Sequence, residues 1–271
     1  MVTQAEKVAE FRGLHRTGEP LLLANAWDIG SARFLAGLGF RALATTSSGF
    51  AATLGRRDYR VTRDEALAHA QALVEATDVP VSADLENCFA DDPAGVADTI
   101  ERAVANGLAG CSIEDFTGDR ADPIYALDLA TERVAAAAEA AHASGDFVLT
   151  ARSENFLHGR QDLADTILRL QRFQEAGADV LYAPALVSLD DIRSVVSSVD
   201  RPVNVLTVPG LPSVAELASV GFARISVGGA FAFAALGAVA AAGRELLDEG
   251  TYGWMQGAGA ARSVIATDFE T

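Results

Sequence analysis

The sequence alternates eight short apolar runs with eight amphipathic stretches, and this alternation constrains the fold more than any other feature. The runs have the composition of β-strands and lie at 21–27, 42–48, 79–85, 109–115, 147–154, 179–185, 202–208 and 223–229. The stretches have helical spacing and lie near 29–38, 62–76, 93–106, 131–144, 162–176, 188–198, 213–220 and 230–248. Several helix-to-strand joints carry a Gly that ends the helix, as in "AGLGFRAL" and "EAGADVLY".

Strands that are apolar throughout, rather than alternating, are typical of parallel strands buried on both faces. Eight β-then-α units within 271 residues therefore predict an α/β fold, a (β/α)8 TIM barrel. An open doubly wound sheet is the alternative, because a count of strands does not show closure. No linker or low-complexity segment interrupts the pattern, so we expect one domain over 1–271 with an extra helix at 4–15.

Composition narrows the class of partner. The 21 Lys and Arg residues face 37 Asp and Glu residues, a formal charge of −16, which argues against nucleic acid and anionic membranes. A small anionic substrate remains compatible, because one local Arg and a divalent cation reverse the field inside a pocket. Two cysteines imply no disulfide framework, and the N-terminus has no signal-peptide core. The run "GGAFAFAALGAVAAAG" is too short and too rich in Gly and Ala for a membrane span, so we expect a cytoplasmic protein.

Polar residues gather where the predicted strands end, which is the side of a barrel that carries active sites. Asp84, Glu86 and Glu114 follow neighbouring strands, and Asp84 and Glu86, two residues apart on an extended chain, should share a face. Oxygen ligands without a His or Cys cluster suit Mg²⁺ or Mn²⁺ better than Zn²⁺. Acids that cap the next helix or lie in solvent are the alternative for each of them.

Arg152 follows the strand "FVLT", so its guanidinium should point to the barrel mouth, where it can clamp a carboxylate. A structural ion pair to Glu114 or Glu154 is the alternative. Thr46, Ser47 and Ser48 offer hydroxyls and N–H groups to a carboxylate or enolate, or simply form a turn. Cys88 is expected to be an ordinary loop residue, because no His lies near it in the sequence.

Together these segments resemble the isocitrate lyase / phosphoenolpyruvate mutase superfamily, and most closely its phosphoenolpyruvate-mutase-like branch. The resemblance runs in order through "NAWDIGSARFLAGLGFRALATTSSGFAATLGRRD" (25–58), "VPVSADLENCF" (79–89), "CSIED" (111–115), "LTARSENF" (149–156) and "NVLTVPGLPSVAELASVGFARISVGG" (204–229). It implies a (β/α)8 barrel whose C-terminal helix is swapped between subunits of a dimer of dimers, a homotetramer. It also implies Mg²⁺-dependent making or breaking of C–C or P–C bonds beside a 2-oxo acid.

The resemblance also assigns roles position by position. Asp84 matches the direct metal ligand, Glu86 stands where the family often has Asp, and Glu114 matches the acid of the next strand. Asp58 matches a loop acid that contacts the water shell of the metal. The expected catalytic residues are therefore Arg152, Asp58 and Glu114, and the expected substrate contacts are Trp27, Thr46, Ser47, Ser48, Asp84, Arg152 and Thr207.

Departures from the family narrow the reaction. The loop after "IED" reads "FTGDRADPIYAL" (116–127) and lacks the Cys of the lyases and the Lys of the mutases, and "YAPAL" (182–186) lacks the usual Glu or His. We therefore expect a Mg²⁺-dependent lyase that cleaves or decarboxylates a small 2-oxo or 2-hydroxy di- or tricarboxylate. Its proton would come from Asp119, Asp122 or Tyr125 in that loop.

Two alternatives remain open from the sequence. One is a phosphonate enzyme, a mutase or a P–C hydrolase, which needs more cations at the mouth, from Arg56, Arg57 or Arg120. The other is a 2-oxo-acid binder that has kept the metal site and lost the lyase Cys.

Overall fold

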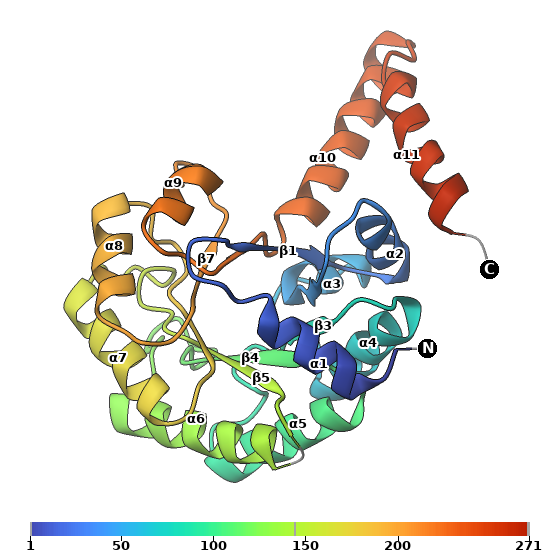
Figure 1. The fold of residues 1–271 in the computed structure, drawn as a ribbon. Helices are drawn as coiled ribbons and strands as arrows, with labels where there is room; N and C mark the ends of the chain where they lie inside the picture. Colours follow the sequence, from blue (N-terminus) through green and yellow to red (C-terminus); the bar gives the residue numbers. More distant parts are fainter. Residues whose placement is uncertain (1, 144, 270–271) are drawn as a thin grey trace.

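Eight parallel strands close into a barrel in chain order, since β1 pairs with both β2 and β8 (Figure 1). The computed structural model describes residues 2–143 and 145–269. The strands are Leu21–Ala26 (β1), Leu43–Thr45 (β2), Val81–Asp84 (β3), Gly110–Glu114 (β4), Val148–Arg152 (β5), Val180–Tyr182 (β6), Val203–Leu206 (β7) and Arg224–Ser226 (β8). Each lies within a predicted apolar run, so the (β/α)8 barrel is confirmed and the open sheet is excluded.

Helices follow the strands and cover the outside of the barrel. They are Ile29–Gly37 (α2), Arg63–Ala76 (α4), Pro93–Ala105 (α5), Leu127–His142 (α6), Leu163–Glu175 (α7), Leu189–Ser197 (α8), Val214–Ser219 (α9) and Ala230–Arg244 (α10). Six of them begin after an Asp, Ser or Thr whose side chain accepts a hydrogen bond from an N–H of the first turn: Asp28, Thr62, Asp92, Asp162, Ser188 and Ser213. The joints of the barrel are therefore encoded locally.

A short helix that the apolar pattern did not predict interrupts the second unit. The expected strand at 42–48 ends at Thr45, and α3 (Ser47–Thr53) begins two residues later. Thr46 causes this change, because its hydroxyl accepts a hydrogen bond of 3.3 Å from the N–H of Gly49 and caps the helix. Ser47 and Ser48 consequently lie in the first turn of a helix at the barrel mouth.

The N-terminal helix α1 (Gln4–Gly13), expected at 4–15, closes the opposite end of the barrel. Its Val8 and Phe11 pack with residues that begin the strands, among them Leu21 and Val148, in one apolar cluster. Gly110 permits this packing, because a Cβ there would lie 2.5 Å from the Val148 oxygen and 3.0 Å from the Phe11 ring. The barrel is thus open only at the carboxyl ends of its strands.

The C-terminal segment forms an arm that projects from the barrel (Figure 1). Helix α10 continues through a π-helical turn, η1 (Glu245–Glu249), and α11 (Met255–Asp268) returns to pack against α2. The continuous helix Ala230–Glu249 has 20 residues and an 18-residue window with a mean hydropathy of 1.5, so by length and composition alone it could cross a membrane. Its exposed apolar side chains, such as Val239 and Leu247, equally suit packing against another protein chain.

Candidate active site

A cavity of about 160 Å³ opens at the carboxyl ends of the strands, where the sequence places the polar residues. Its upper wall consists of side chains from the strand ends and the loops that follow them: Asn25, Thr46, Ser47, Ser48, Asp58, Tyr59, Asp84, Glu114, Arg152, Tyr182 and Ser226. Below them the cavity reaches Ser82, Ser112, Asn204 and Arg224 inside the barrel. Most of the predicted polar residues therefore face one enclosed volume.

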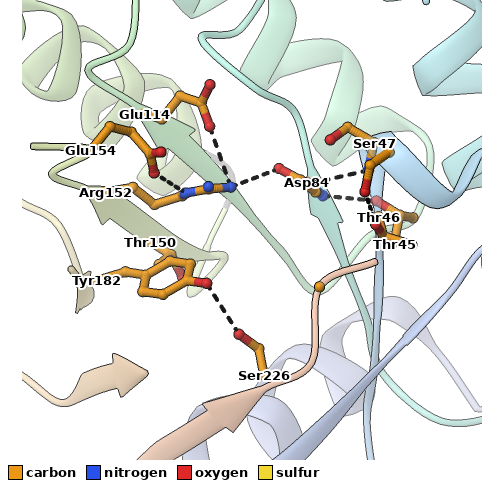
Figure 2. A network of polar contacts seen from close by, with 12 residues as sticks. Thr45, Thr46, Ser47, Asp84, Glu114, Thr150, Arg152, Glu154, Tyr182 and Ser226 are labelled. Carbon is orange, nitrogen blue, oxygen red and sulfur yellow. Dashed lines mark hydrogen bonds and ion pairs between the residues drawn. The ribbon is translucent and has the colours of Figure 1, made fainter. Parts of the chain in front are cut away.

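Arg152 lies at the centre of a cluster of carboxylates (Figure 2). Its Nη1 is 3.0 Å from Asp84 Oδ1 and 3.3 Å from Glu114 Oε2, and its Nε donates a hydrogen bond of 2.8 Å to Glu154. Burial opposes its charge, but the three carboxylates raise the pKa of Arg152 well above its usual value, so it stays protonated. Within the described residues its second terminal nitrogen, Nη2, makes no hydrogen bond and can serve a ligand.

Asp84 is held in place from the neighbouring strand. Its N–H donates a hydrogen bond of 2.8 Å to the Thr45 hydroxyl, and its Oδ2 accepts one of 3.1 Å from the N–H of Ser47. Figure 2 shows these contacts on one side of the carboxylate and Arg152 on the other. The end of β2 and the start of α3 therefore orient the carboxylate toward the cavity.

Glu86 lies beside the cluster and is not among the described residues that line the cavity, so its position differs from the one that the sequence indicated. The strand β3 ends at Asp84, and Glu86 has a left-handed backbone with φ of 51°. The direction of the Glu86 side chain therefore does not follow from the alternation of side chains along a strand. Its side chain lines a small hollow beside Asp84 and His69. Burial, and then the charges of Asp84 and Asp58, raise the pKa of Glu86 to about 8.

Glu114 is almost wholly buried and accepts a hydrogen bond of 2.9 Å from the Tyr59 phenol. Burial raises its pKa well above the usual value, although Arg152 opposes the shift. Asp58 lies at the rim, where burial of its carboxyl and the neighbouring charge of Asp84 raise its pKa. Glu154 differs, because the Arg152 guanidinium and His158 overcome its burial and lower its pKa.

Three carboxylates pair with the Arg152 guanidinium, and Asp58 and Glu86, whose pKa values burial raises, lie near enough to Asp84 for its charge to raise them further; a divalent cation would relieve this excess of acids. The described residues contain no group of three His, Cys, Asp or Glu side chains already arranged to hold a metal ion. The cluster is still compatible with Mg²⁺, because bound Mg²⁺ keeps several waters and needs only one or two carboxylates as direct ligands. Asp84 and the buried Glu86, for whose carboxyl group no hydrogen bond is found in the described part of the chain, are the residues that would supply such ligands.

Other residues that the sequence singled out lie away from the cavity. Trp27 is half-buried and packs beside Gly49, and Thr207 is exposed, with its N–H bonded to the Ser226 oxygen. Neither is among the residues that line the cavity. Arg56 instead pairs with Glu65 on the surface.

The loop at 116–127 is a short closed turn that keeps its polar groups to itself. The N–H of Thr117 donates a hydrogen bond to the Pro123 oxygen, and its hydroxyl donates one to the Asp122 oxygen. Asp119 accepts a hydrogen bond from the N–H of Ala121, and Tyr125 donates one to Asp91. Asp119, Asp122 and Tyr125 are absent from the described lining of the cavity, so nothing in this geometry brings them to a substrate.

Both cysteines are fully buried. Burial raises the pKa of Cys88 to about 12, so this thiol is neither a nucleophile nor a ready acid at neutral pH. Although Cys88 lies close to Asp84 and Glu86 in the sequence, it is absent from the described lining of the cavity.

Sequence reasoning missed Tyr59, Tyr182, Asn204, Arg224 and Ser226, all of which line the cavity. Tyr59 follows Asp58 directly, which was the available signal for it. The other four occupy inward positions on β6, β7 and β8, and Arg224 and Ser226 are two residues apart on β8. Because side chains alternate between the two faces of a strand, the strand pattern could have indicated these residues once a barrel was assumed.

Comparison with known proteins identifies the family. The family model for phosphoenolpyruvate phosphomutase matches residues 11–247, most of the chain. A solved structure of a candidate lyase/mutase from Burkholderia cenocepacia J2315 is 51% identical, covers 93% of this chain and 92% of its own, and superposes with a TM-score of 0.91. The chain belongs to the phosphoenolpyruvate phosphomutase family. Within the wider superfamily of isocitrate lyases and phosphoenolpyruvate mutases, the resemblance stated from the sequence is confirmed.

Members of this family with named reactions are more distant. The structure of 2,3-dimethylmalate lyase is 27% identical, with a TM-score of 0.82 and coverage of 93% of this chain and 90% of its own. The oxaloacetate decarboxylase of Chromohalobacter salexigens is 27% identical over 84% of this chain and 80% of its own. The phosphoenolpyruvate phosphomutase family therefore places this chain among lyases and mutases of small carboxylates.

Proposed function

We propose that the protein is a Mg²⁺-dependent lyase that acts on a small 2-oxo or 2-hydroxy di- or tricarboxylate by C–C cleavage or decarboxylation. The observation that carries the proposal is the cluster of carboxylates around Arg152 in the cavity at the barrel mouth. Acids alone would repel an anionic substrate, so the cluster favours a bound cation that accepts both. The names of the relatives support small carboxylates as the substrate class.

Asp84 and Glu86 are the residues that would hold the cation, with Glu114 and Asp58 placed to contact its water shell. A divalent cation here would supply Lewis-acid polarisation of the oxo group and stabilise the negative charge that develops when the bond breaks. Mn²⁺ has the same preference for oxygen ligands and is expected to substitute.

The residues of the chain itself bind and orient the substrate. Ser47 and Ser48 line the cavity beside Asp84 and offer their hydroxyls to a substrate, while the N–H of Ser47 already donates to Asp84. Arg152 remains charged and keeps Nη2 for a substrate carboxylate. Burial, and then the nearby Glu114, raise the pKa of Tyr59, so its phenol stays protonated, and its O–H, which lies in the cavity wall, is donated to Glu114 and holds that carboxyl group in place.

The first experiment measures pyruvate or other 2-oxo-acid release from oxaloacetate and from substituted malates, with Mg²⁺ and with EDTA. We expect turnover of at least one substrate that EDTA abolishes. In parallel, Mg²⁺ with oxalate should raise the melting temperature of the wild type and of Asp128→Asn, whose side chain is exposed, but not of Asp84→Ala. Intact stabilisation of Asp84→Ala would refute the metal site.

The family name favours one alternative, a phosphonate mutase or P–C hydrolase. Such an enzyme needs cations around a dianionic phosphonate, and Arg56, Arg57 and Arg120 are all exposed and absent from the described lining of the cavity. Phosphate release or rearrangement with phosphonopyruvate, without turnover of dicarboxylates, would establish this alternative. Stabilisation by Mg²⁺ and oxalate without turnover of any of these substrates would instead indicate a 2-oxo-acid binder.

We further propose that the arm of α10 and α11 packs against a second copy of the chain in a homotetramer in the cytoplasm. The exposed apolar side chains on α10 and η1 support this arrangement, because Phe233, Val239 and Leu247 are each more than half exposed. Val239→Asp together with Leu247→Asp should lower the mass measured by light scattering. An unchanged mass would contradict the assembly through this arm.

A further inference from the structure

The interior of this barrel is unusually small and polar directly beneath the carboxylate cluster. TIM barrels usually fill this level with bulky branched side chains. Here the inward residues two positions before the mouth are Ala44 below Thr46, Ser82 below Asp84, Ser112 below Glu114, Thr150 below Arg152, and Arg224 below Ser226. Ala44, Ser82, Ser112, Asn204 and Arg224 all line the same cavity as the cluster, so the cavity continues downward as an inner chamber.

Arg224 crosses the barrel at the bottom of this chamber. It starts on β8 and donates hydrogen bonds of 2.9 Å from Nε to Asn204 and of 3.0 Å from Nη2 to the Thr150 hydroxyl on β5. Its Nη1 lies 3.2 Å from Nε2 of His15, just beyond α1. The residue is only 3% exposed, so its charge is almost fully removed from solvent.

All three partners of Arg224 are uncharged. His15 Nδ1 bonds the Phe11 oxygen at 2.8 Å, which leaves Nε2 as an acceptor, and burial and Arg224 together lower the pKa of His15 to about 3. In the described part of the chain no carboxylate pairs with Arg224. Arg169, buried to a similar degree, pairs with both Asp115 and Asp165.

A buried guanidinium without a counter-charge is costly, and it is rarely kept without a compensating partner. Three of the five N–H groups of Arg224 are engaged, which leaves two donors. Since Arg224 lines the cavity, a ligand in the chamber can reach those donors. The complement of this site is therefore a small anionic group that enters from the mouth.

We propose that the chamber is an inner anion subsite in which Arg224 receives the second carboxylate of a dicarboxylate substrate. The other end of the substrate then lies at the mouth, between Ser47 and Arg152; this inference rests on the proposed function. Thr150 and Arg152 are two residues apart on β5, about 7 Å along the strand, which matches the scale of a four-carbon dicarboxylate standing along the barrel axis. The subsite accordingly selects dicarboxylates over monocarboxylates of equal chelating power.

The test compares two inhibitors in the presence of Mg²⁺, by calorimetry. Oxalate is too short to leave the mouth, whereas malate presents a second carboxylate to the chamber. We expect Arg224→Gln to lower the affinity for malate at least about tenfold and the affinity for oxalate less than about twofold, because only malate loses a charge-assisted hydrogen bond. Arg224→Lys should lie between, and Arg172→Gln, at an exposed arginine, should match the wild type.

An equal loss of affinity for both ligands, or an unchanged affinity for malate, would overturn the inner subsite. Failure of oxalate to bind the wild type would count against the proposed function instead. The inner subsite is then tested independently, by the bromide soak that follows. Wild-type crystals soaked in bromide should show an anomalous peak beside Arg224, which also serves if the variants do not fold. Ordered water in place of bromide would refute an anion site.

Discussion

Tyr59 donates a hydrogen bond of 2.9 Å to Glu114 while its own backbone is held in the left-handed region, with φ of 60°. A bulky residue rarely adopts this conformation, and the strain is of the order of 1 kcal/mol or more. The contacts that compensate are the bond to Glu114 and an edge-to-face contact with Phe116 at 4.9 Å. Such strain beside a candidate active site indicates a side chain that is required there.

Two substitutions at Tyr59 separate the side chain from the backbone. Tyr59→Phe keeps the ring and the strain but loses the bond to Glu114, so we expect kcat to fall at least about tenfold and the free energy of unfolding to fall by about 1 kcal/mol. Tyr59→Gly removes the strain and should unfold at a temperature equal to or above that of Tyr59→Phe, with equally low activity. Steady-state kinetics and thermal denaturation measure both, and wild-type turnover by Tyr59→Phe would exclude a role for the phenol.

Glu86 makes the metal-free protein sensitive to pH. Its pKa of about 8 in the folded state lies above the ordinary value of 4.5, so the folded state holds a proton that the unfolded state releases first. This contribution to the free energy of unfolding is fully present below pH 4.5, is lost as pH rises to about 8, and amounts to roughly 3–5 kcal/mol. Denaturant unfolding in EDTA across this range should show the loss.

The matched control is Glu86→Gln, which keeps the shape and removes the titration. Its stability in EDTA should depend less on pH than that of the wild type between pH 5 and 8. Mg²⁺ should bind the wild type more tightly as pH rises in the same window, because the cation competes with the proton on Glu86. An identical pH dependence in both proteins would mean that Glu86 is not the group that titrates.

The barrel itself followed from the sequence because its signals are local. Most of the helices that follow a strand begin with a side-chain cap, as at Asp92 before α5, and each strand lies within a largely apolar run, as β5 does. The segment Thr46–Ser48 is where the local pattern was misleading. It was expected to end a strand, but the Thr46 hydroxyl caps a helix, α3, that begins at Ser47. A strand and a capped helix compete there, and only the packing decides.

The site was predictable to the extent that it depends on strand ends. Asp84, Glu114 and Arg152 meet because parallel strands present their carboxyl ends together. Tyr59 and Arg224 were not predicted, because nothing in their local sequence marks them as site residues. Tyr59 is a loop residue whose position depends on its positive φ, and Arg224 is a charged residue within an apolar run. The loop at 116–127 was expected to supply the acid, and its internal hydrogen bonds turn it elsewhere.

Arg133 is expected to control the geometry of Glu86 from behind. Its guanidinium donates to the carbonyls of Asn87, Ala90 and Asp91, in a loop where Glu86, Cys88 and Phe89 all have positive φ. Arg133→Met removes all three bonds at a fully buried site, so we expect a loss of about 3 kcal/mol in stability and a weaker Mg²⁺ affinity. Arg133→Lys should recover part of both, and an unchanged Mg²⁺ affinity in a folded Arg133→Met would show that the loop holds its shape unaided.

Cys88 lies between the proposed metal ligands Asp84 and Glu86 and the rest of that loop, and its thiol is expected to take no part in the reaction. It is fully buried, and burial raises its pKa to about 12, so a thiolate is scarcely formed at neutral pH. Cys88→Ala should therefore keep kcat within about twofold of the wild type and lose about 1 kcal/mol of stability from the small cavity it leaves. The native protein should react with a thiol reagent only after unfolding. A large loss of kcat in a folded Cys88→Ala, with KM unchanged, would return the thiol to the chemistry of the site.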